Sequence, residues 1–195
     1  MTGFQSILLL RHELLLIVAA LAIIVVDLSL PAGKKTRIIH FSLILFSVVF
    51  LLSFFPTKSG ELFGGSFQGN QLTGFMKDIL NLAVLIVFLQ SGGYLRKKEN
   101  SHKMAEFFVL IIFTLIGMDF MISSGDFLTF FIGLETASIP IAGLAAYDQL
   151  KSRSAEAGVK LILLSALSSG VLLYGISMIY GATGSIYFKD IALKI

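Results

Sequence analysis

The sequence predicts an all-α polytopic membrane protein with about six transmembrane helices and its N-terminus outside. Of its 195 residues, 56% are hydrophobic and only 14% are charged, and the mean hydropathy is +0.90. A soluble domain of this size does not need so much apolar content. The apolar residues also form long runs of about 20 residues, the length that a helix needs to cross about 30 Å of hydrocarbon. These runs lack strict alternation, which favours helices over the strands of a membrane barrel.

Six segments have approximately the length and composition of a membrane span. They are Leu14–Leu30, Ile38–Phe55, Ile79–Leu95, Phe107–Ser123, Phe127–Tyr147 and Gly158–Tyr180. The first segment has some features of a signal peptide, but Arg11 is followed by His12 and Glu13, and residues 29–33 lack a small-x-small cleavage site. We therefore expect a retained helix.

The longest stretch between these spans is residues 56–74, which contains five glycines. It lacks the Gly-Lys-Ser/Thr ending of a phosphate-binding loop, and we predict a flexible outer loop. The turn at residues 123–126 is so short that the fourth and fifth helices must be antiparallel neighbours. In the polar loop at 96–103, His102 has no accompanying ligand cluster and is expected to be solvated.

Residues 185–195 at the C-terminal end of the chain are amphipathic and too short to cross a membrane. We expect this segment to lie along the outer surface or to begin a further element.

The distribution of basic residues predicts the topology. With the N-terminus outside, nine Lys and Arg residues fall on the cytoplasmic side and five on the outer side. This excess agrees with the positive-inside rule. The cytoplasmic group is Lys34, Lys35, Arg37, Arg96, Lys97, Lys98, Lys103, Lys151 and Arg153, and the outer group is Arg11, Lys58, Lys77, Lys189 and Lys194.

Composition also argues against two other kinds of function. The net charge of +3 comes from residues in short loops between spans, so it does not indicate a nucleic-acid partner. The chain has no cysteine, and therefore has neither a disulfide nor the thiolates that usually hold an iron–sulfur cluster.

Glu135 is the most informative polar residue because it lies roughly midway along an apolar span. It follows Phe127 by eight positions, or about 12 Å of helix. A carboxylate in hydrocarbon costs on the order of 3 kcal/mol, so such residues usually face a bundle interior or an aqueous path. Positions three or four apart along its face carry small residues, which allow another helix to approach closely. These are Ser138, Ala142, Ala145 and Ala146.

Pro140 lies one turn after this acid. Its ring removes an amide donor and clashes with the carbonyl of Thr136, which predicts a kinked helix. A loosened backbone beside a carboxylate favours entry of water. We therefore interpret Glu135 as a functional acid that faces protein.

Lys160 begins the next span, and its neighbourhood permits two interpretations. Glu156 precedes it by four residues, the favourable order for a helical ion pair, so Lys160 is either a snorkelling residue or an inward-facing proton carrier. Asp27 and Asp119 lie closer to span ends, and we expect both to be interfacial or helix-end residues. A stripe of small residues on the sixth helix predicts packing rather than chemistry: Ser165, Ala166, Ser169 and Gly170.

Residues 155–160, 165–170 and 174–184, together with Gly133-Leu134-Glu135, resemble the subunit N family of bacterial NADH:quinone oxidoreductase (respiratory complex I). The resemblance is strong over roughly residues 115–190. It implies an antiporter-like, multi-pass membrane-arm subunit that takes part in proton translocation coupled to quinone reduction in the bacterial plasma (inner) membrane. By this resemblance, Glu135 and Lys160 form a buried proton relay.

The same resemblance implies that this chain binds no cofactor. NADH, FMN, iron–sulfur clusters and quinone are expected in partner subunits, and the partners are other membrane subunits, the lipid bilayer and, indirectly, the quinone pool. Family members have about fourteen helices, so the chain resembles the first part of such a subunit. We expect residues 1–103 to be a three-helix segment and 104–195 to begin the antiporter-like repeat, in a partial or truncated chain.

Three alternatives remain open from the sequence. A related cation/proton antiporter or membrane-bound hydrogenase subunit would use the same residues without NADH. A non-catalytic membrane scaffold would need Glu135 only for assembly. A solute transporter is the third alternative, although the sequence indicates no substrate pocket of several residues.

Overall fold

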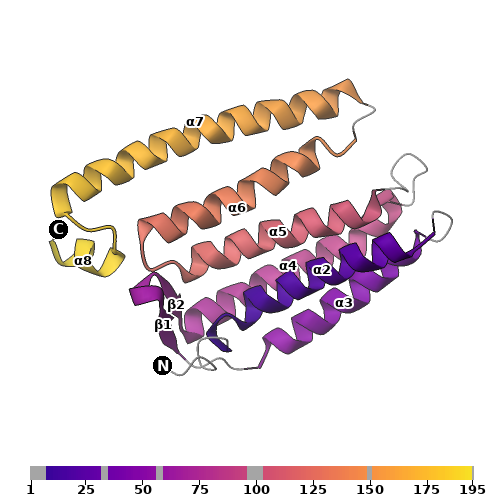
Figure 1. The fold of residues 1–195 in the computed structure, drawn as a ribbon, viewed down its shortest axis with the longest axis horizontal. Coiled ribbons are helices and arrows are strands. Elements are labelled where there is room, and N and C mark those ends of the chain that lie inside the picture. Colours follow the sequence, from indigo (N-terminus) through magenta and orange to yellow (C-terminus); the bar gives the residue numbers. More distant parts are fainter. Residues whose placement is uncertain (1–7, 32–34, 56–58, 96–102, 149–150, 195) are drawn as a thin grey trace.

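The fold is a bundle of long helices that lie side by side, with a small hairpin at one end (Figure 1). The computed structural model describes residues 8–31, 35–55, 59–95, 103–148 and 151–194. The long helices are α2 (Arg11–Ser29), α3 (Arg37–Ser53), α4 (Gln71–Leu95), α5 (Met104–Ser123), α6 (Phe127–Ala145) and α7 (Ser152–Thr183). The short elements are β1 (Gly60–Leu62), the 3-10 helix η2 (Phe63–Gly65), β2 (Phe67–Gly69) and α8 (Phe188–Lys194).

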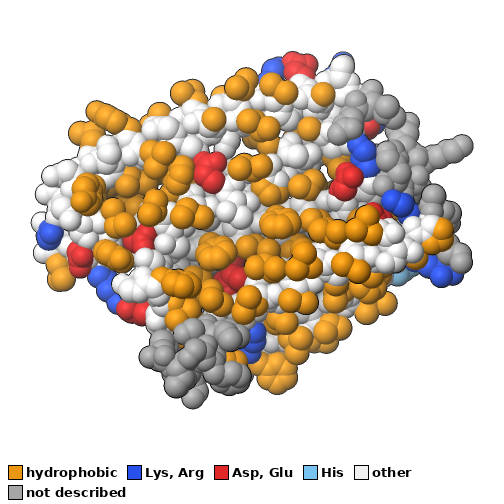
Figure 2. Space-filling model, in the orientation of Figure 1, with side chains coloured by type: hydrophobic (Ala, Val, Ile, Leu, Met, Phe, Trp, Pro, Cys, Tyr) orange, Lys and Arg blue, Asp and Glu red, His pale blue; other side chains and the backbone are white. Residues whose placement is uncertain are grey.

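The predicted all-α membrane fold is confirmed. Within the described ranges, five helices are long and apolar enough to span a membrane, and α3 is a shorter apolar helix of 17 residues. Hydrophobic side chains spread over the face seen in Figure 2, while Lys and Arg gather mainly toward its two ends. Several helices extend beyond the predicted spans: α4 begins at Gln71 rather than Ile79, and α7 has 32 residues. Helical hydrogen bonding continues through polar residues, which a search for apolar runs excludes.

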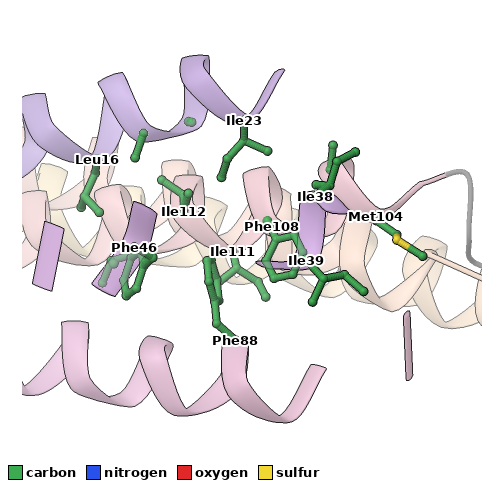
Figure 3. Packing of buried hydrophobic residues seen from close by; sticks show 14 of the residues in the cluster. Leu16, Ile23, Ile38, Ile39, Phe46, Phe88, Met104, Phe108, Ile111 and Ile112 are labelled. Carbon is green, nitrogen blue, oxygen red and sulfur yellow. The ribbon is translucent and has the colours of Figure 1, made fainter. Parts of the chain in front are cut away.

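Helices α2 to α5 enclose the larger hydrophobic core (Figure 3). The ring of Phe88 on α4 lies between Phe46 of α3 and Phe108 of α5, with both centroid distances at 4.7 Å. Leu16 and Ile23 of α2 complete this core and are at most 1% exposed. The first apolar segment is thus an integral part of the bundle.

Helices α5, α6 and α7 continue the bundle as a layer in which α6 lies between the other two (Figure 1). Gly117 of α5 meets α6 backbone to backbone, because a Cβ there would lie 2.3 Å from the nitrogen of Ala137. Gly133 of α6 is equally restricted, since its Cβ would lie 2.8 Å from the carbonyl oxygen of Gly117. The antiparallel pairing of the fourth and fifth predicted spans is confirmed by this contact between α5 and α6.

The prediction of a flexible loop at residues 56–74 was wrong for residues 59–74, which the structure describes. β1 and β2 form an antiparallel hairpin that buries Leu62 and Phe67. Gly125 joins this hairpin to the turn before α6, because its N–H donates to the carbonyl of Ser66 at 2.8 Å. A Cβ on Gly125 would lie 1.9 Å from the Gly65 oxygen, so the contact requires glycine.

The C-terminal segment closes the same end of the bundle, which we call the hairpin end. The Phe188 N–H donates to the Gly125 carbonyl at 3.1 Å, and the Phe188 ring lies 4.9 Å from that of Phe127. Lys189 of α8 forms an ion pair with Glu61 of β1. The segment therefore packs on the bundle end that carries the turn before α6, as the sequence predicts. Which side of the membrane this end faces stays a prediction.

Two of the expected residue environments can be compared with the structure, and a third cannot. Asp27 lies near the end of α2, where its carboxylate is 3.4 Å from the amine of Lys35, in agreement with a helix-end role. Asp119 lies near the end of α5, as expected, but it is 0% exposed and therefore not interfacial, because α5 is the central helix and even its last turns are covered. His102 lies outside the described residues.

Candidate functional site

Glu135 lies on α6 and is half-buried against α7. The hydroxyl of Ser169, which is 8% exposed, donates a hydrogen bond to Oε1 of this carboxylate. The acid therefore meets a protein donor near the middle of the membrane-spanning segment. The small-residue stripe on α7 was interpreted as packing alone, and Ser169 shows that this interpretation was incomplete.

The contact between α6 and α7 depends on small residues on both helices. A Cβ on Gly158 of α7 would lie 2.5 Å from the Cβ of Ala146 and 3.2 Å from the carbonyl oxygen of Ala142. Close approach by another helix along the small-residue face of α6 is thus confirmed. This approach carries the backbone of α7 near enough for a side chain as short as serine to reach Glu135.

Pro140 lies inside α6, which remains one helix from Phe127 to Ala145. Because proline has no N–H, the carbonyl of Thr136 lacks its usual helical donor. Nearby hydroxyls do not supply one: Thr136 Oγ1 donates to the carbonyl of Ile132, and Ser138 Oγ donates to that of Leu134. An available acceptor therefore lies one residue after Glu135.

Lys160 does not contact Glu135. Its Nζ lies 2.5 Å from Oε1 of Glu156, and both side chains are more than half exposed. Lys160 also precedes Ser169 by nine positions on α7, which places it about 13 Å away along the axis and half a turn around the helix. Proton exchange between Lys160 and Glu135 therefore requires intervening water or side chains.

By the proton-translocation function that the family resemblance implies, replacing Ser169 with alanine is expected to slow translocation by about tenfold in an assembled complex. The reason is that a hydrogen bond to an ionised group contributes about 1.5 kcal/mol, roughly a factor of ten. Proton pumping in membrane vesicles measures the effect. Ser168→Ala is the matched control, because Ser168 is adjacent but exposed, and equal rates for the two variants would contradict a role for this hydrogen bond.

A second group of charged residues lies in the bundle near the hairpin end and was missed from the sequence. We call it the buried charge cluster, and it consists of His12, Glu13, Lys77, Asp78 and Asp119. Lys77 Nζ lies 2.5 Å from Oε1 of Glu13, and these two residues are 4% and 2% exposed. His12 Nε2 lies 3.8 Å from Oδ1 of Asp78.

The sequence contained only a weak signal for this cluster. Glu13 directly precedes three leucines and Asp119 lies between Met118 and Phe120, so both acids have apolar neighbours. Charges at the ends of apolar runs are normally assigned to the interface, and Lys77 was counted as an outer-side residue for that reason. No sequence pattern pairs Lys77 with Glu13, which is 64 positions away.

Among the described residues, no group of three or more His, Cys, Asp or Glu side chains has an arrangement that could hold a metal ion. Both the Glu135 site and the buried charge cluster consist of carboxylates with hydroxyl, amine or imidazole neighbours. Groups of this kind bind and transfer protons.

Comparison with known proteins shows which family the chain resembles. The model for the transmembrane region shared by NADH:quinone oxidoreductase and Mrp antiporter subunits matches residues 124–195. NADH-quinone oxidoreductase subunit N of Phocaeicola vulgatus is 42% identical over 186 residues, which cover 95% of this chain and 39% of the relative. Subunit N of Azobacteroides pseudotrichonymphae is 43% identical over 194 residues, covering 98% and 40%. The predicted family resemblance is confirmed. The chain spans about two fifths of the length of these relatives.

Solved structures agree with the subunit N resemblance. A chain of respiratory complex I from Thermus thermophilus with bound aureothin matches with a TM-score of 0.66 and 25% identity, over 90% of this chain and 38% of that one. The membrane-bound sulfane sulfur reductase, an archaeal respiratory membrane complex, has the same fold, with a TM-score of 0.64 at 23% identity over 97% and 39%. Together with five apolar helices of spanning length, the bacterial relatives support a multi-pass location in the inner membrane.

Proposed function

We propose that this chain is part of a membrane-arm subunit of NADH:quinone oxidoreductase that takes part in proton translocation coupled to quinone reduction. The observation that carries the proposal is a carboxylate, Glu135, held midway along a spanning helix by a hydroxyl donor from the next helix. An ionisable group kept at this depth is rarely structural. The subunit N relatives support the assignment to this enzyme.

In this proposal Glu135 and Lys160 are the proton-carrying residues of one relay. Glu135 accepts a proton when its carboxylate is ionised and releases it when Ser169 and nearby water stabilise the ionised form. Lys160 lies nearer the end of the bundle opposite the hairpin, where its amine forms an ion pair with Glu156. Water beside the free carbonyl of Thr136, one turn before Pro140, would connect the two groups.

Charge changes in neighbouring subunits would drive the relay. Two charges 4 Å apart interact by about 4 kcal/mol at an effective dielectric of 20, enough to move a proton when the partner departs. The partner subunits would carry NADH, FMN, the iron–sulfur clusters and quinone, and this chain would contribute no redox group. Residues 104–195 would form the beginning of the antiporter-like repeat, and 1–103 a preceding three-helix segment.

The test is Glu135→Gln in the assembled membrane complex, with proton translocation measured per NADH oxidised. Glutamine keeps the shape and the acceptor oxygen but cannot be ionised, so we expect normal assembly and a loss of pumping of about 100-fold or more. Glu106→Gln is the matched control, because Glu106 is an exposed glutamate in the first turn of α5.

The possible results separate the candidate functions. Normal pumping by assembled Glu135→Gln would remove Glu135 from the mechanism. Poor assembly with normal pumping per complex would instead indicate a scaffold. A cation/proton antiporter, which the family description also includes, predicts ion exchange that continues without NADH.

A further inference from the structure

The buried charge cluster contains more hydrogen-bond acceptors than donors. Both carboxylate oxygens of Asp119 are buried without a hydrogen-bond partner, as are Oε2 of Glu13 and Oδ1 of Asp78. The buried donors without a partner, Nε of Arg11 and the hydroxyls of Ser42 and Ser123, belong to residues outside the cluster. Asp119 itself is 0% exposed. A buried carboxylate without any donor is strongly unfavourable, whereas a protonated carboxylic acid is neutral and can donate to one of these acceptors. The observation therefore points to a bound proton.

The charges of the cluster lead to the same conclusion. Lys77 is the cation that acts most strongly on Asp119, and Glu13 and Asp78 are the anions. The Lys77 ammonium is already hydrogen-bonded to Glu13 and lies 5.0 Å from the centre of the Phe67 ring. One ammonium therefore serves two buried carboxylates, and like charges in one buried site cannot easily both ionise.

We propose that the buried charge cluster is a proton-exchange site, in which Asp119 holds a proton that passes through Glu13 and His12 to water at the hairpin end. In the resting state Asp119 is the acid and Glu13 pairs with Lys77. When the proton moves from Asp119 to Glu13, the Lys77 ammonium donates its hydrogen bond to the newly ionised Asp119. The total charge of the cluster is unchanged, because the proton stays within it. Glu13 then passes the proton to Nε2 of His12, which releases it to water. A proton taken up from water by the reverse steps protonates Asp119 again and restores the resting state.

The structure provides the connection to water. His12 and Asp78 both line a pocket of about 470 Å³, whose other lining residues include Ser53 and Gln71. His12 Nε2 is buried without a hydrogen-bond partner, so it is available as a proton acceptor. Arg11, the neighbouring cation, is directed elsewhere, since its guanidinium donates to the backbone carbonyl of Ser53 at 3.1 Å.

This site is separate from Glu135. Gly117 of α5 contacts α6, whereas Asp119 follows by two positions and lies about 200° further around the helix. The side chains around Asp119 come instead from α2 and α4, and the nearby strand β2 contributes Phe67 but no charge. The proposal therefore does not depend on the relay between Glu135 and Lys160.

The test is infrared difference spectroscopy of the assembled complex, which detects the C=O stretch of a protonated carboxyl group. We expect Asp119→Asn to remove one such band. Glu13→Gln should also remove it, because Asp119 then becomes the counter-ion of Lys77. In the double variant Glu13→Gln/Lys77→Met the cation is absent, so Asp119 stays protonated and the band should remain.

His12→Gln tests the exit route. The carboxyl band should keep its intensity, but its shift after transfer to D₂O should be slower by about 100-fold, the usual contribution of one proton-transfer group.

The matched control for the carboxylate variants Asp119→Asn and Glu13→Gln is Asp126→Asn. Asp126 is 2% exposed at the same end, but it accepts hydrogen bonds from both N and Oγ1 of Thr129, so its variant should leave the band unchanged.

Three results would overturn the proposal: a band that survives Asp119→Asn, a band unaffected by Glu13→Gln, or an isotope shift in His12→Gln as fast as in the unmodified protein. The infrared difference spectra can be recorded whether or not the complex pumps protons. Glu135→Gln should retain the band, so failure of the Glu135 relay and failure of this site give different results.

Discussion

Gly117→Ala is expected to destabilise the bundle by about 3 kcal/mol, because the added methyl group would overlap backbone rather than a movable side chain. The new Cβ would lie 2.3 Å from the nitrogen and 2.8 Å from the Cα of Ala137, and 2.7 Å from the oxygen of Gly133. Only separation of α5 from α6 relieves these contacts. The midpoint of denaturant unfolding in detergent micelles measures the loss.

Gly143→Ala is the matched control for Gly117→Ala. Gly143 lies on α6 against α5, but a Cβ there would meet only the Leu110 side chain at 3.6 Å, an ordinary contact. Because alanine favours helix over glycine by about 1 kcal/mol, this variant should be neutral or slightly more stable. Equal unfolding midpoints for the two variants would contradict the close packing of α5 on α6.

Lys77→Met is expected to cost about 3 kcal/mol or more, since removing one partner of a buried ion pair leaves the other uncompensated. Glu13 is 2% exposed and has no other hydrogen-bond partner in the part of the chain that the structure describes. The double variant Glu13→Gln/Lys77→Met should recover most of this loss, because a buried ion pair contributes little beyond a neutral pair of similar shape. The unfolding midpoints of the unmodified protein, Lys77→Met, Glu13→Gln and the double variant form a double-mutant cycle.

Lys189→Met gives the comparison for an exposed pair at the same end of the bundle. Lys189 and Glu61 are 63% and 50% exposed, and exposed ion pairs contribute about 1 kcal/mol at most. Its unfolding midpoint should therefore remain close to that of the unmodified protein. If Lys77→Met and Lys189→Met had similar effects, the burial of Lys77 would have no energetic consequence.

The sequence located the spans well because membrane helices are recognised from a local sum of side-chain hydropathies. It also placed Glu135 midway along a span and identified the small face of α6, since both follow from position along a regular helix. It did not predict the burial of Asp119 or the ordered hairpin in residues 59–74, because both depend on which other elements cover these residues. Asp119 is buried because α2 and α4 enclose α5, and residues 59–74 are ordered because they pair with each other and with Gly125.

The sequence by itself determined that the chain crosses a membrane as helices, which family it resembles and which acid lies deep in a span. Only the tertiary structure decided that Ser169 is the partner of Glu135, that Lys160 points elsewhere, and that Lys77 pairs with Glu13. The physical reason is that hydropathy depends on each residue and its chain neighbours. Contacts across helices depend instead on the rotation and spacing of each helix, which are set by packing between residues far apart in sequence.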